Sequence, residues 1–103
     1  MGNKYFYILF RKASQDLEEI FKYISVDLSN PSAAKKLIEE FLEAFERICS
    51  FPYSCPIVSD LNLKESDVRK LIVGNYIAFY KVDGTEIKIF RIRHSTTNYQ
   101  IKI

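Results

Sequence analysis

Two turn signals near the end of the chain constrain its fold more than any other feature. The dipeptides Gly74-Asn75 and Asp83-Gly84 divide segment 68–94 into three short runs that are rich in Val, Ile, Phe and Tyr. Turn dipeptides between β-forming runs at this spacing are typical of consecutive antiparallel strands. The segment is therefore predicted to form a three-stranded antiparallel meander.

Lysine and arginine follow these predicted strands and divide the charge of the chain unevenly. Residues 67–103 contain seven Lys and Arg against three acidic residues, a net charge of +4, whereas residues 1–66 contain eight against ten, a net charge of −2. Such asymmetry is typical of a protein with a negatively charged partner, although an ordinary solvated sheet face is the alternative. The cations on the predicted strands are Arg69, Lys70, Lys81, Lys88, Arg91 and Arg93.

Length and composition favour one globular domain that spans residues 1–103. The hydrophobic fraction of 48% and the aromatic fraction of 15% indicate a packed core. No run approaches the about 18 apolar residues of a membrane span, and no signal peptide opens the chain, so we expect a cytoplasmic protein without a membrane partner. Cys49 and Cys55 would need two more ligands to bind a metal, and His94 supplies one. We therefore expect no metal, and in a cytoplasmic protein we expect reduced thiols, with a disulfide between the two cysteines as the alternative.

The first half of the chain is predicted to contain one strand and two helices. Residues 4–10 form an apolar run that is typical of a strand buried on both faces or central in a sheet. A helical pattern follows, with Ser14 as its candidate N-cap. Asn30 and Pro31 favour the start of a second helix, which should end before Pro52. The predicted core positions are Leu17, Ile20, Phe21, Ile24 and Leu28 on the first helix, and Ala34, Leu37, Ile38, Phe41, Phe45 and Ile48 on the second.

The predicted order is strand, helix, helix, a loop at residues 52–66, and three strands. The two helices should form an antiparallel hairpin, because their connection is short, and the hairpin should cover one face of the meander. The predicted fold is therefore α+β and two-layered, with an N-terminal strand, a helical hairpin and a three-stranded antiparallel meander. The other face of the sheet is left open, and the cations are expected there or at strand ends.

The chain resembles the toxins of the RelE/ParE superfamily, which belong to bacterial type II toxin–antitoxin and plasmid-stabilisation modules. The resemblance covers nearly the whole chain, and its motifs occur in the order of that superfamily. They are A-x-x-D-L-E-E-I-x-x-Y-I at residues 13–24, N-P-x-A-A at 30–34, I-x-x-F-P at 48–52, V-R-K-L-I-V-G-N-Y-I-A-F-Y-K-V at 68–82 and I-x-R-I-x-H at 89–94.

The resemblance implies a RelE/ParE-like fold and a small cytoplasmic toxin that a cognate antitoxin holds inactive. ParE-like members resemble inhibitors of DNA gyrase, whereas RelE-like members resemble ribosome-dependent mRNA endoribonucleases. We therefore expect a toxin that inhibits growth when it is free of its antitoxin, with gyrase or the ribosome and its mRNA as the target. Neither mechanism requires a cofactor or a small-molecule substrate. A non-toxic protein-interaction module is a third alternative.

The residue after Tyr76 separates the two toxin mechanisms. RelE-like nucleases commonly have an arginine there, but Ile77 can neither donate to a phosphate nor transfer a proton. We therefore expect a ParE-like inhibitor that is not an enzyme, with the nuclease as the alternative. The catalytic candidates in a nuclease are Lys70, Arg91, Arg93, His94 and Tyr99, and the candidates for binding the target or the antitoxin are Arg69, Lys70, Lys81, Arg91 and Arg93.

Overall fold

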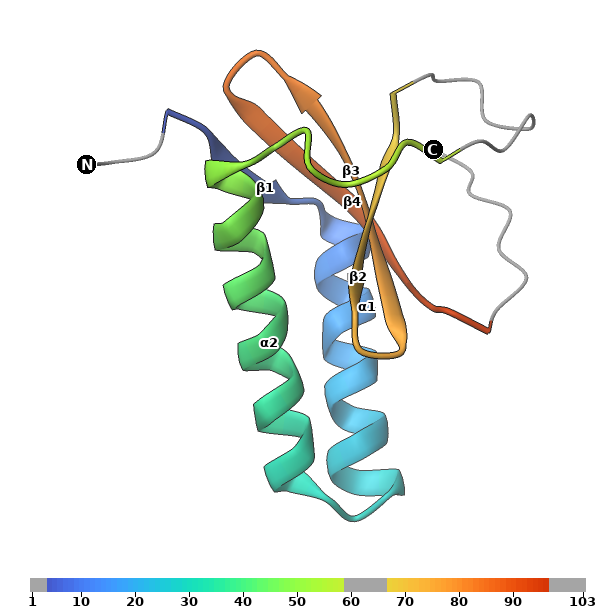
Figure 1. The fold of residues 1–103 in the computed structure, drawn as a ribbon. Helices are drawn as coiled ribbons and strands as arrows, with labels where there is room; N and C mark the ends of the chain where they lie inside the picture. The colour runs from blue at the N-terminus through green and yellow to red at the C-terminus, as the bar shows by residue number, and fades with distance from the viewer. Residues whose placement is uncertain (1–3, 59–66, 97–103) are drawn as a thin grey trace.

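The computed structural model describes residues 4–58 and 67–96, which form one strand, a helical hairpin and three further strands (Figure 1). The predicted α+β fold is confirmed. The two helices run in opposite directions, and a π-helical turn, η1, lengthens the first of them. The elements are β1 (Phe6–Leu9), α1 (Arg11–Lys22), η1 (Tyr23–Asp27), α2 (Pro31–Ser50), β2 (Arg69–Val73), β3 (Tyr76–Asp83) and β4 (Glu86–His94).

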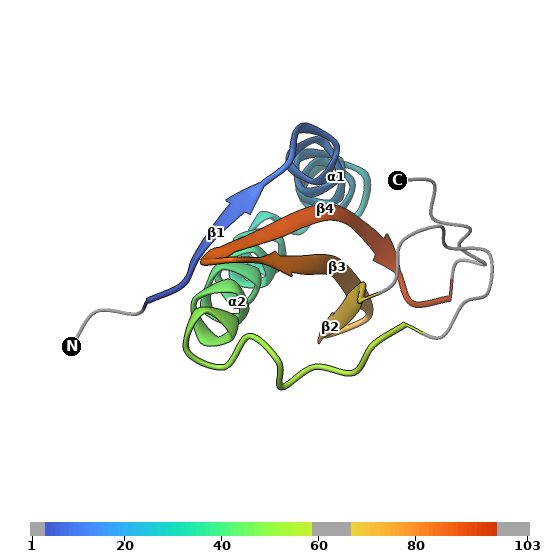
Figure 2. The same ribbon diagram turned by 90° about the horizontal axis from the view of Figure 1, so that it is seen from above.

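The sheet is mixed and has the strand order β1-β4-β3-β2 (Figure 2). The antiparallel meander of β2, β3 and β4 is confirmed, and Gly74 and Gly84 supply the positive φ angles of its two turns. β1 pairs in parallel with β4, and the helical hairpin provides the crossover that a parallel pair requires. β1 is therefore an edge strand, and the prediction of a central or doubly buried strand is wrong. The run of apolar residues suggested burial on both faces of the strand. In the structure, Phe6 is exposed and the residues next to it pack against the core.

α1 begins earlier than predicted, at Arg11, with Phe10 as its N-cap residue. Ser14 lies inside the helix, so its prediction as the N-cap is wrong. The start is set by the sheet, because the Phe10 N–H still donates to the Ile89 carbonyl at 2.8 Å and the Ser14 N–H already donates to the Phe10 carbonyl. Strand pairing with β4 thus continues up to the residue at which the helix begins. No further residue lies between the strand and the helix to act as a side-chain cap.

The buried stripe of α1 is narrower than predicted. Leu17 is buried and Ile20 and Ile24 are half-buried, but Phe21 is 41% exposed and Leu28 is also exposed. The prediction of Phe21 and Leu28 as core residues is wrong. Ala13, Asp16 and Leu17 set the buried face, which leaves Phe21 at its margin. The π-helical turn changes the helical phase before Leu28, so the 3.6-residue period no longer applies there.

α2 starts and packs as predicted. The Asn30 side chain accepts a hydrogen bond from the Ala33 N–H at 3.2 Å, and Pro31 is the first helical residue. Phe41 and Phe45 are fully buried, and each such side chain contributes about 1.5 to 3 kcal/mol through removal from water. The predicted core positions of α2 are all buried or half-buried.

Both helices cover the same face of the sheet, which we call the helix face, and the opposite side is the outer face. The outer face has a smaller apolar cluster of Val68, Ile77, Phe79 and Phe90, against which Val58 packs. The helix-face core consists of Ala13, Leu17, Phe41, Ala44, Phe45, Ile48, Cys49, Leu71, Val73, Ala78, Tyr80, Ile87, Ile89 and Ile92.

Of the predicted loop at residues 52–66, the structure describes residues 52–58. This segment returns to the sheet along the outer edge of β2, where the Val58 N–H donates to the Val68 carbonyl at 2.7 Å and the Lys70 N–H donates to the Pro56 carbonyl at 3.1 Å. Cys49 is a buried free thiol and Cys55 is a half-buried one.

Candidate functional site

Three of the predicted binding cations lie on the outer face of the sheet. Lys70 is opposite Phe79 and Arg93 is opposite Ile77 in the β-ladder, and both of these apolar partners belong to the outer-face cluster. Lys81 is opposite Lys88, whose ammonium group bonds the Asp83 carboxylate at 2.8 Å. The expected basic face therefore exists, but it is built from Lys70, Lys81, Lys88 and Arg93.

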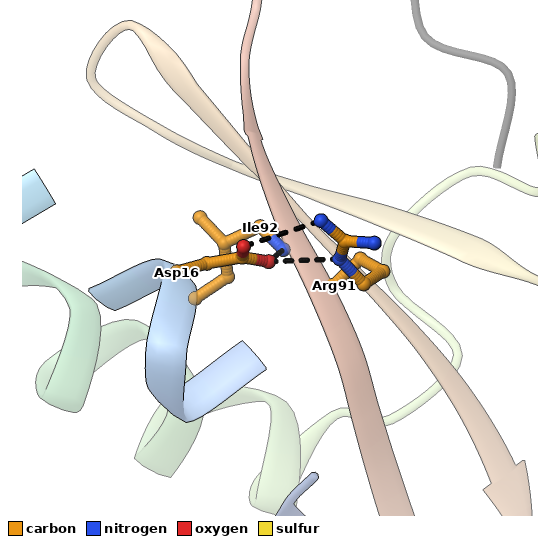
Figure 3. A network of polar contacts seen from close by, with 3 residues as sticks. All are labelled: Asp16, Arg91 and Ile92. Atoms are coloured by element: carbon orange, nitrogen blue, oxygen red, sulfur yellow. Dashed lines mark hydrogen bonds and ion pairs between the residues drawn. The ribbon is translucent and has the colours of Figure 1, made fainter. Parts of the chain in front are cut away.

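The guanidinium of Arg91 is not available on the outer face, because it binds Asp16 of α1 (Figure 3). Its Nε donates to Asp16 Oδ2 at 2.9 Å and its Nη2 donates to Asp16 Oδ1 at 3.2 Å. The Ile92 N–H also donates to Asp16 Oδ2, at 2.9 Å. The two side chains are 18% and 11% exposed, so the pair is largely removed from water. Arg91 is therefore committed to an ion pair within the chain.

A β-bulge on β4 precedes this ion pair. Phe79 is opposite Arg91, but Tyr80 is opposite Ile89, so Phe90 is an extra residue on β4. A bulge of this kind re-aims the side chains that follow it. Phe90 lies in the outer-face cluster, and Arg91, the next residue, reaches α1. The bulge thus places Phe90 on the outer face, directly before the arginine that binds Asp16.

Arg69 is also committed to a contact within the chain. Its Nη1 donates to the Cys55 carbonyl at 2.6 Å and to the Tyr53 carbonyl at 3.3 Å. Its guanidinium lies 5.1 Å from the centre of the Tyr53 ring, a cation–π contact. Arg69 therefore fixes the segment after α2 to the start of β2, and it does not lie on the outer face with Lys70.

The middle strand has no cation at the position after Tyr76. Ile77 is only 6% exposed and packs in the outer-face cluster next to Arg93. Tyr76 faces the other way, where its ring lies 6.0 Å from that of Phe41. Burial raises the pKa of Tyr76, with a smaller contribution from Tyr23, so its hydroxyl stays protonated near neutral pH and cannot act as a general base.

His94 packs edge-on against Tyr76, with 5.1 Å between the ring centres. Its Nδ1 accepts a hydrogen bond from the Thr96 N–H at 3.2 Å and lies 2.6 Å from Thr96 Oγ1. A backbone N–H can only donate, so the neutral ring has its proton on Nε2. His94 therefore has Nε2–H as its available donor, and Arg93 is its neighbour in the strand.

A groove of about 860 Å³ lies between the helical hairpin and the end of the sheet. Its helical wall includes the apolar residues Ile20, Ile24 and Leu37, and its sheet wall includes Arg93 and His94. The remaining lining residues are Asp16, Glu19, Tyr23, Leu28, Asn30, Ala33, Gly74, Asn75, Tyr76 and Ile92. Of the predicted catalytic candidates, the groove thus unites Arg93 and His94 only. Tyr99 lies outside the described residues.

Two groups outside this groove, the thiol of Cys49 and the phenol of Tyr7, are poor nucleophiles. Burial, and then the nearby Glu46 charge, raise the pKa of the Cys49 thiol. The same two causes raise the pKa of Tyr7. Since the thiolate is the reactive form of cysteine, Cys49 fits a structural role in the core.

Sequence reasoning missed Asp16 as a structural residue. The available signal was its position between Ala13 and Leu17 in the buried stripe of α1, because a carboxylate on an apolar face requires a partner. It also missed Ile72, a strand residue that is 62% exposed on the outer face. Alternation along β2 contains this signal, since Leu71 and Val73 face the helices.

In the part of the chain that the structure describes, no three His, Cys, Asp or Glu side chains meet in a group that could hold a metal ion. None of the described helices is long and apolar enough to cross a membrane.

The sequence matches a family model over most of its length. The family is the ParE toxin of type II toxin–antitoxin systems (parDE), and the match covers residues 7–99. No curated protein matches the sequence.

Two solved structures have a similar fold. One is described as the chromosomal ParDE toxin–antitoxin system from P. aeruginosa; it has a TM-score of 0.70 and 24% identity, and the match covers 90% of this chain and 98% of that chain. The other is the toxin–antitoxin complex RelBE2 from Mycobacterium tuberculosis, with a TM-score of 0.58, 20% identity, and coverage of 87% of this chain and 96% of that chain. At this identity the likeness concerns the fold.

Proposed function

Because the chain belongs to the family of ParE toxins of type II toxin–antitoxin systems, we propose that it inhibits growth by binding DNA gyrase when it is free of its antitoxin. The proposed toxin acts in the cytoplasm, where gyrase and the translation machinery are both located. It uses no cofactor and transforms no small molecule. Its effect comes from binding a protein target.

The observation that carries this choice is the commitment of Arg91 to Asp16. A nuclease needs cations that are available to stabilise the charge that develops on a phosphate. Arg91 would have to leave a bidentate, largely buried ion pair to do so. Ile77 also offers no cation in the middle strand. These two features support a binding protein over an endoribonuclease.

One observation favours the nuclease as a second candidate. Arg93 and His94 both line the groove, and the His94 Nε2–H is a donor that could transfer a proton. This pair, with Lys70 on the outer face, is what remains of the predicted catalytic set among the described residues. Tyr76 does not supply the general base of such a site, since burial keeps its phenol protonated by raising its pKa.

A cognate antitoxin is the expected partner of a type II toxin, and both similar structures are described as toxin–antitoxin systems or complexes. We propose that the antitoxin is acidic where it meets the outer face. Lys70, Lys81 and Arg93 are the candidate contacts. Arg69 and Arg91 are less suitable, because each already binds acceptors within the chain.

Induction of the chain in bacterial cells tests the proposal when the DNA-damage response and translation are followed in parallel. A gyrase inhibitor induces the DNA-damage response while translation continues. Immediate translation arrest with cleaved messages, and no early damage response, would instead identify the nuclease. Unchanged growth would identify a non-toxic interaction module.

A further inference from the structure

Ile72 occupies an unusual position in the sheet. Its side chain is 62% exposed, whereas its neighbours Leu71 and Val73 are buried on the helix face. Among the described residues of β2, β3 and β4, it is the one large apolar side chain that is exposed. Single exposed apolar residues are common on protein surfaces, so the surroundings of Ile72 decide whether it has a role.

The strand register places two cations near Ile72 on the outer face. Ile72 is opposite Ile77 on β3, and Ile77 is opposite Arg93 on β4, so these three residues form a row across the sheet. Lys70 lies two residues before Ile72 and therefore on the same face. The exposed Ile72 is thus next to the nearly buried Ile77, with Lys70 on its own strand and Arg93 on the far side of Ile77.

Two acidic residues of the outer face, among those that the structure describes, lie at the other end of the sheet. Asp83 and Glu86 are opposite each other at the turn between β3 and β4, and Asp83 bonds Lys88. Within residues 4–58 and 67–96, no ion pair joins Lys70 or Arg93 to a carboxylate. The positive charge around Ile72 is therefore available to a partner.

The kind of partner follows from the aromatic residues of this face. Proteins that bind single-stranded nucleic acid stack bases on exposed aromatic side chains. Phe79 and Phe90 are the aromatic members of the outer-face cluster, and they are 0% and 7% exposed. A central apolar side chain with a charged rim is instead the usual arrangement at a protein–protein interface.

We propose that Lys70, Ile72 and Arg93, the Ile72 patch, form the surface through which the toxin docks onto its target, and that the target presents an acidic protein surface with an apolar pocket for Ile72. This inference rests on the proposed function and names the target-binding surface. Ile72 anchors the complex, while Lys70 and Arg93 accelerate association by electrostatic attraction.

The test measures inhibition of gyrase supercoiling by the purified chain. Ile72→Glu should weaken inhibition by about 30-fold or more, as expected for loss of a central interface residue that meets an acidic surface. Val26→Glu is the matched control, because Val26 is also 62% exposed but lies in η1. Thermal unfolding verifies that both variants are folded. Ile72→Thr, which keeps the β-branched shape, should weaken inhibition less but in the same direction.

A second pair of variants tests the cations. Lys70→Glu with Arg93→Glu should slow association with gyrase and reduce the dependence of the association rate on salt. Lys12→Glu with Lys35→Glu changes the net charge equally, at exposed positions of the two helices, and should have a much smaller effect.

The outcomes separate this inference from the proposed function. If the unmodified chain does not inhibit gyrase, the proposed function fails and the inference fails with it. If the unmodified chain inhibits gyrase and Ile72→Glu inhibits equally well, only the inference is overturned. Binding of a single-stranded RNA oligonucleotide that depends on Lys70 and Arg93 but not on Ile72 would overturn it as well, since the partner would then be a nucleic acid.

Discussion

Asp16 of α1 and Arg91 of β4, which are 75 residues apart in sequence, form a bidentate ion pair that joins the first helix to the last strand. The same carboxylate accepts the Ile92 N–H. β1 pairs with β4 only as far as Leu9 and Ile89. Beyond that point, Asp16 takes the place of a strand by satisfying a backbone donor on the edge of β4.

Removal of either partner should therefore destabilise the fold strongly. Asp16→Ala leaves the Arg91 guanidinium and the Ile92 N–H without their acceptor in a largely buried place. We expect a loss of about 3 kcal/mol in the free energy of unfolding, as for the breaking of a buried ion pair. Urea denaturation of Asp16→Ala, Arg91→Ala and the double variant measures this loss and the coupling between the two residues.

The exposed pair of Lys88 and Asp83 is the internal control for this experiment. It has a contact distance of 2.8 Å, but the two side chains are 33% and 65% exposed. Water and salt screen such a pair, so Lys88→Ala should change the stability far less than Arg91→Ala. Equal effects of the two substitutions would contradict a structural role for Asp16 and Arg91.

The core of α2 should be more sensitive than the aromatic residue of α1. Phe41 and Phe45 are fully buried, so Phe41→Ala or Phe45→Ala should cost about 3 to 5 kcal/mol, through lost burial and a cavity. Phe21 is 41% exposed, and Phe21→Ala should cost much less. Chemical denaturation of the three variants gives the comparison. A nearly neutral Phe45→Ala, or a Phe21→Ala as costly as Phe41→Ala, would show that the assigned helix faces are wrong.

Local patterns were sufficient to predict the elements. The turn dipeptides predicted the meander, and Asn30 with Pro31 predicted the start of α2, because turns and caps depend on neighbouring residues. The position of β1 was not predictable in the same way. Pairing of β1 with β4 joins residues about 80 apart, and an apolar run does not distinguish a central strand from an edge strand.

The site was less predictable than the fold, because it depends on which cations have partners. Arg69 and Arg91 have the same strand context as Lys70 and Arg93 in the sequence. Asp16 of α1 binds Arg91, and the segment after α2 provides two carbonyls to Arg69. Neither contact has a local signature. The membership of the basic face could therefore be recognised only from the structure.

Arg69 should stabilise the segment after α2. Arg69→Ala removes the donor to the Tyr53 and Cys55 carbonyls and the stacking on the Tyr53 ring. We expect faster hydrogen exchange at the Val58 N–H, which bonds the Val68 carbonyl next to Arg69. Arg69→Lys should restore little of the protection from exchange, because an ammonium lacks the planar group that can stack on the ring and donate hydrogen bonds at the same time. Unchanged exchange at Val58 would mean that Arg69 does not hold this segment.

Tyr80, which also bonds the segment after α2, should make the stability of the fold decrease at alkaline pH. Its hydroxyl is fully buried and donates to the Pro52 carbonyl at 2.8 Å. Burial raises the pKa of Tyr80 far above its usual range, so the folded state keeps the proton while the unfolded chain releases it above about pH 10. The stabilisation is therefore complete below about pH 10 and decreases as the pH rises further.

The measurement is urea denaturation of the unmodified chain and of Tyr80→Phe at several alkaline pH values. Tyr80→Phe should be less stable by about 1 kcal/mol near neutral pH, since it lacks one hydrogen bond. Its disadvantage should shrink above about pH 10, because it has no phenol to ionise in the unfolded state. A constant difference across this range would mean that Tyr80 ionises equally easily in both states.

The decisive prediction on mechanism concerns His94. In a nuclease, His94→Ala removes the proton-transfer group next to Arg93 and should lower the rate of mRNA cleavage by about 10²- to 10⁴-fold. In a gyrase inhibitor, His94 transfers no proton, and it lies outside the Ile72 patch. We therefore expect His94→Ala to retain gyrase inhibition, although loss of the contact with Tyr76 should lower its stability slightly. The unmodified chain and His94→Ala are compared in a supercoiling assay and on ribosome-bound message. Message cleavage by the unmodified chain that disappears in His94→Ala would make the chain an endoribonuclease, with the groove as its active site.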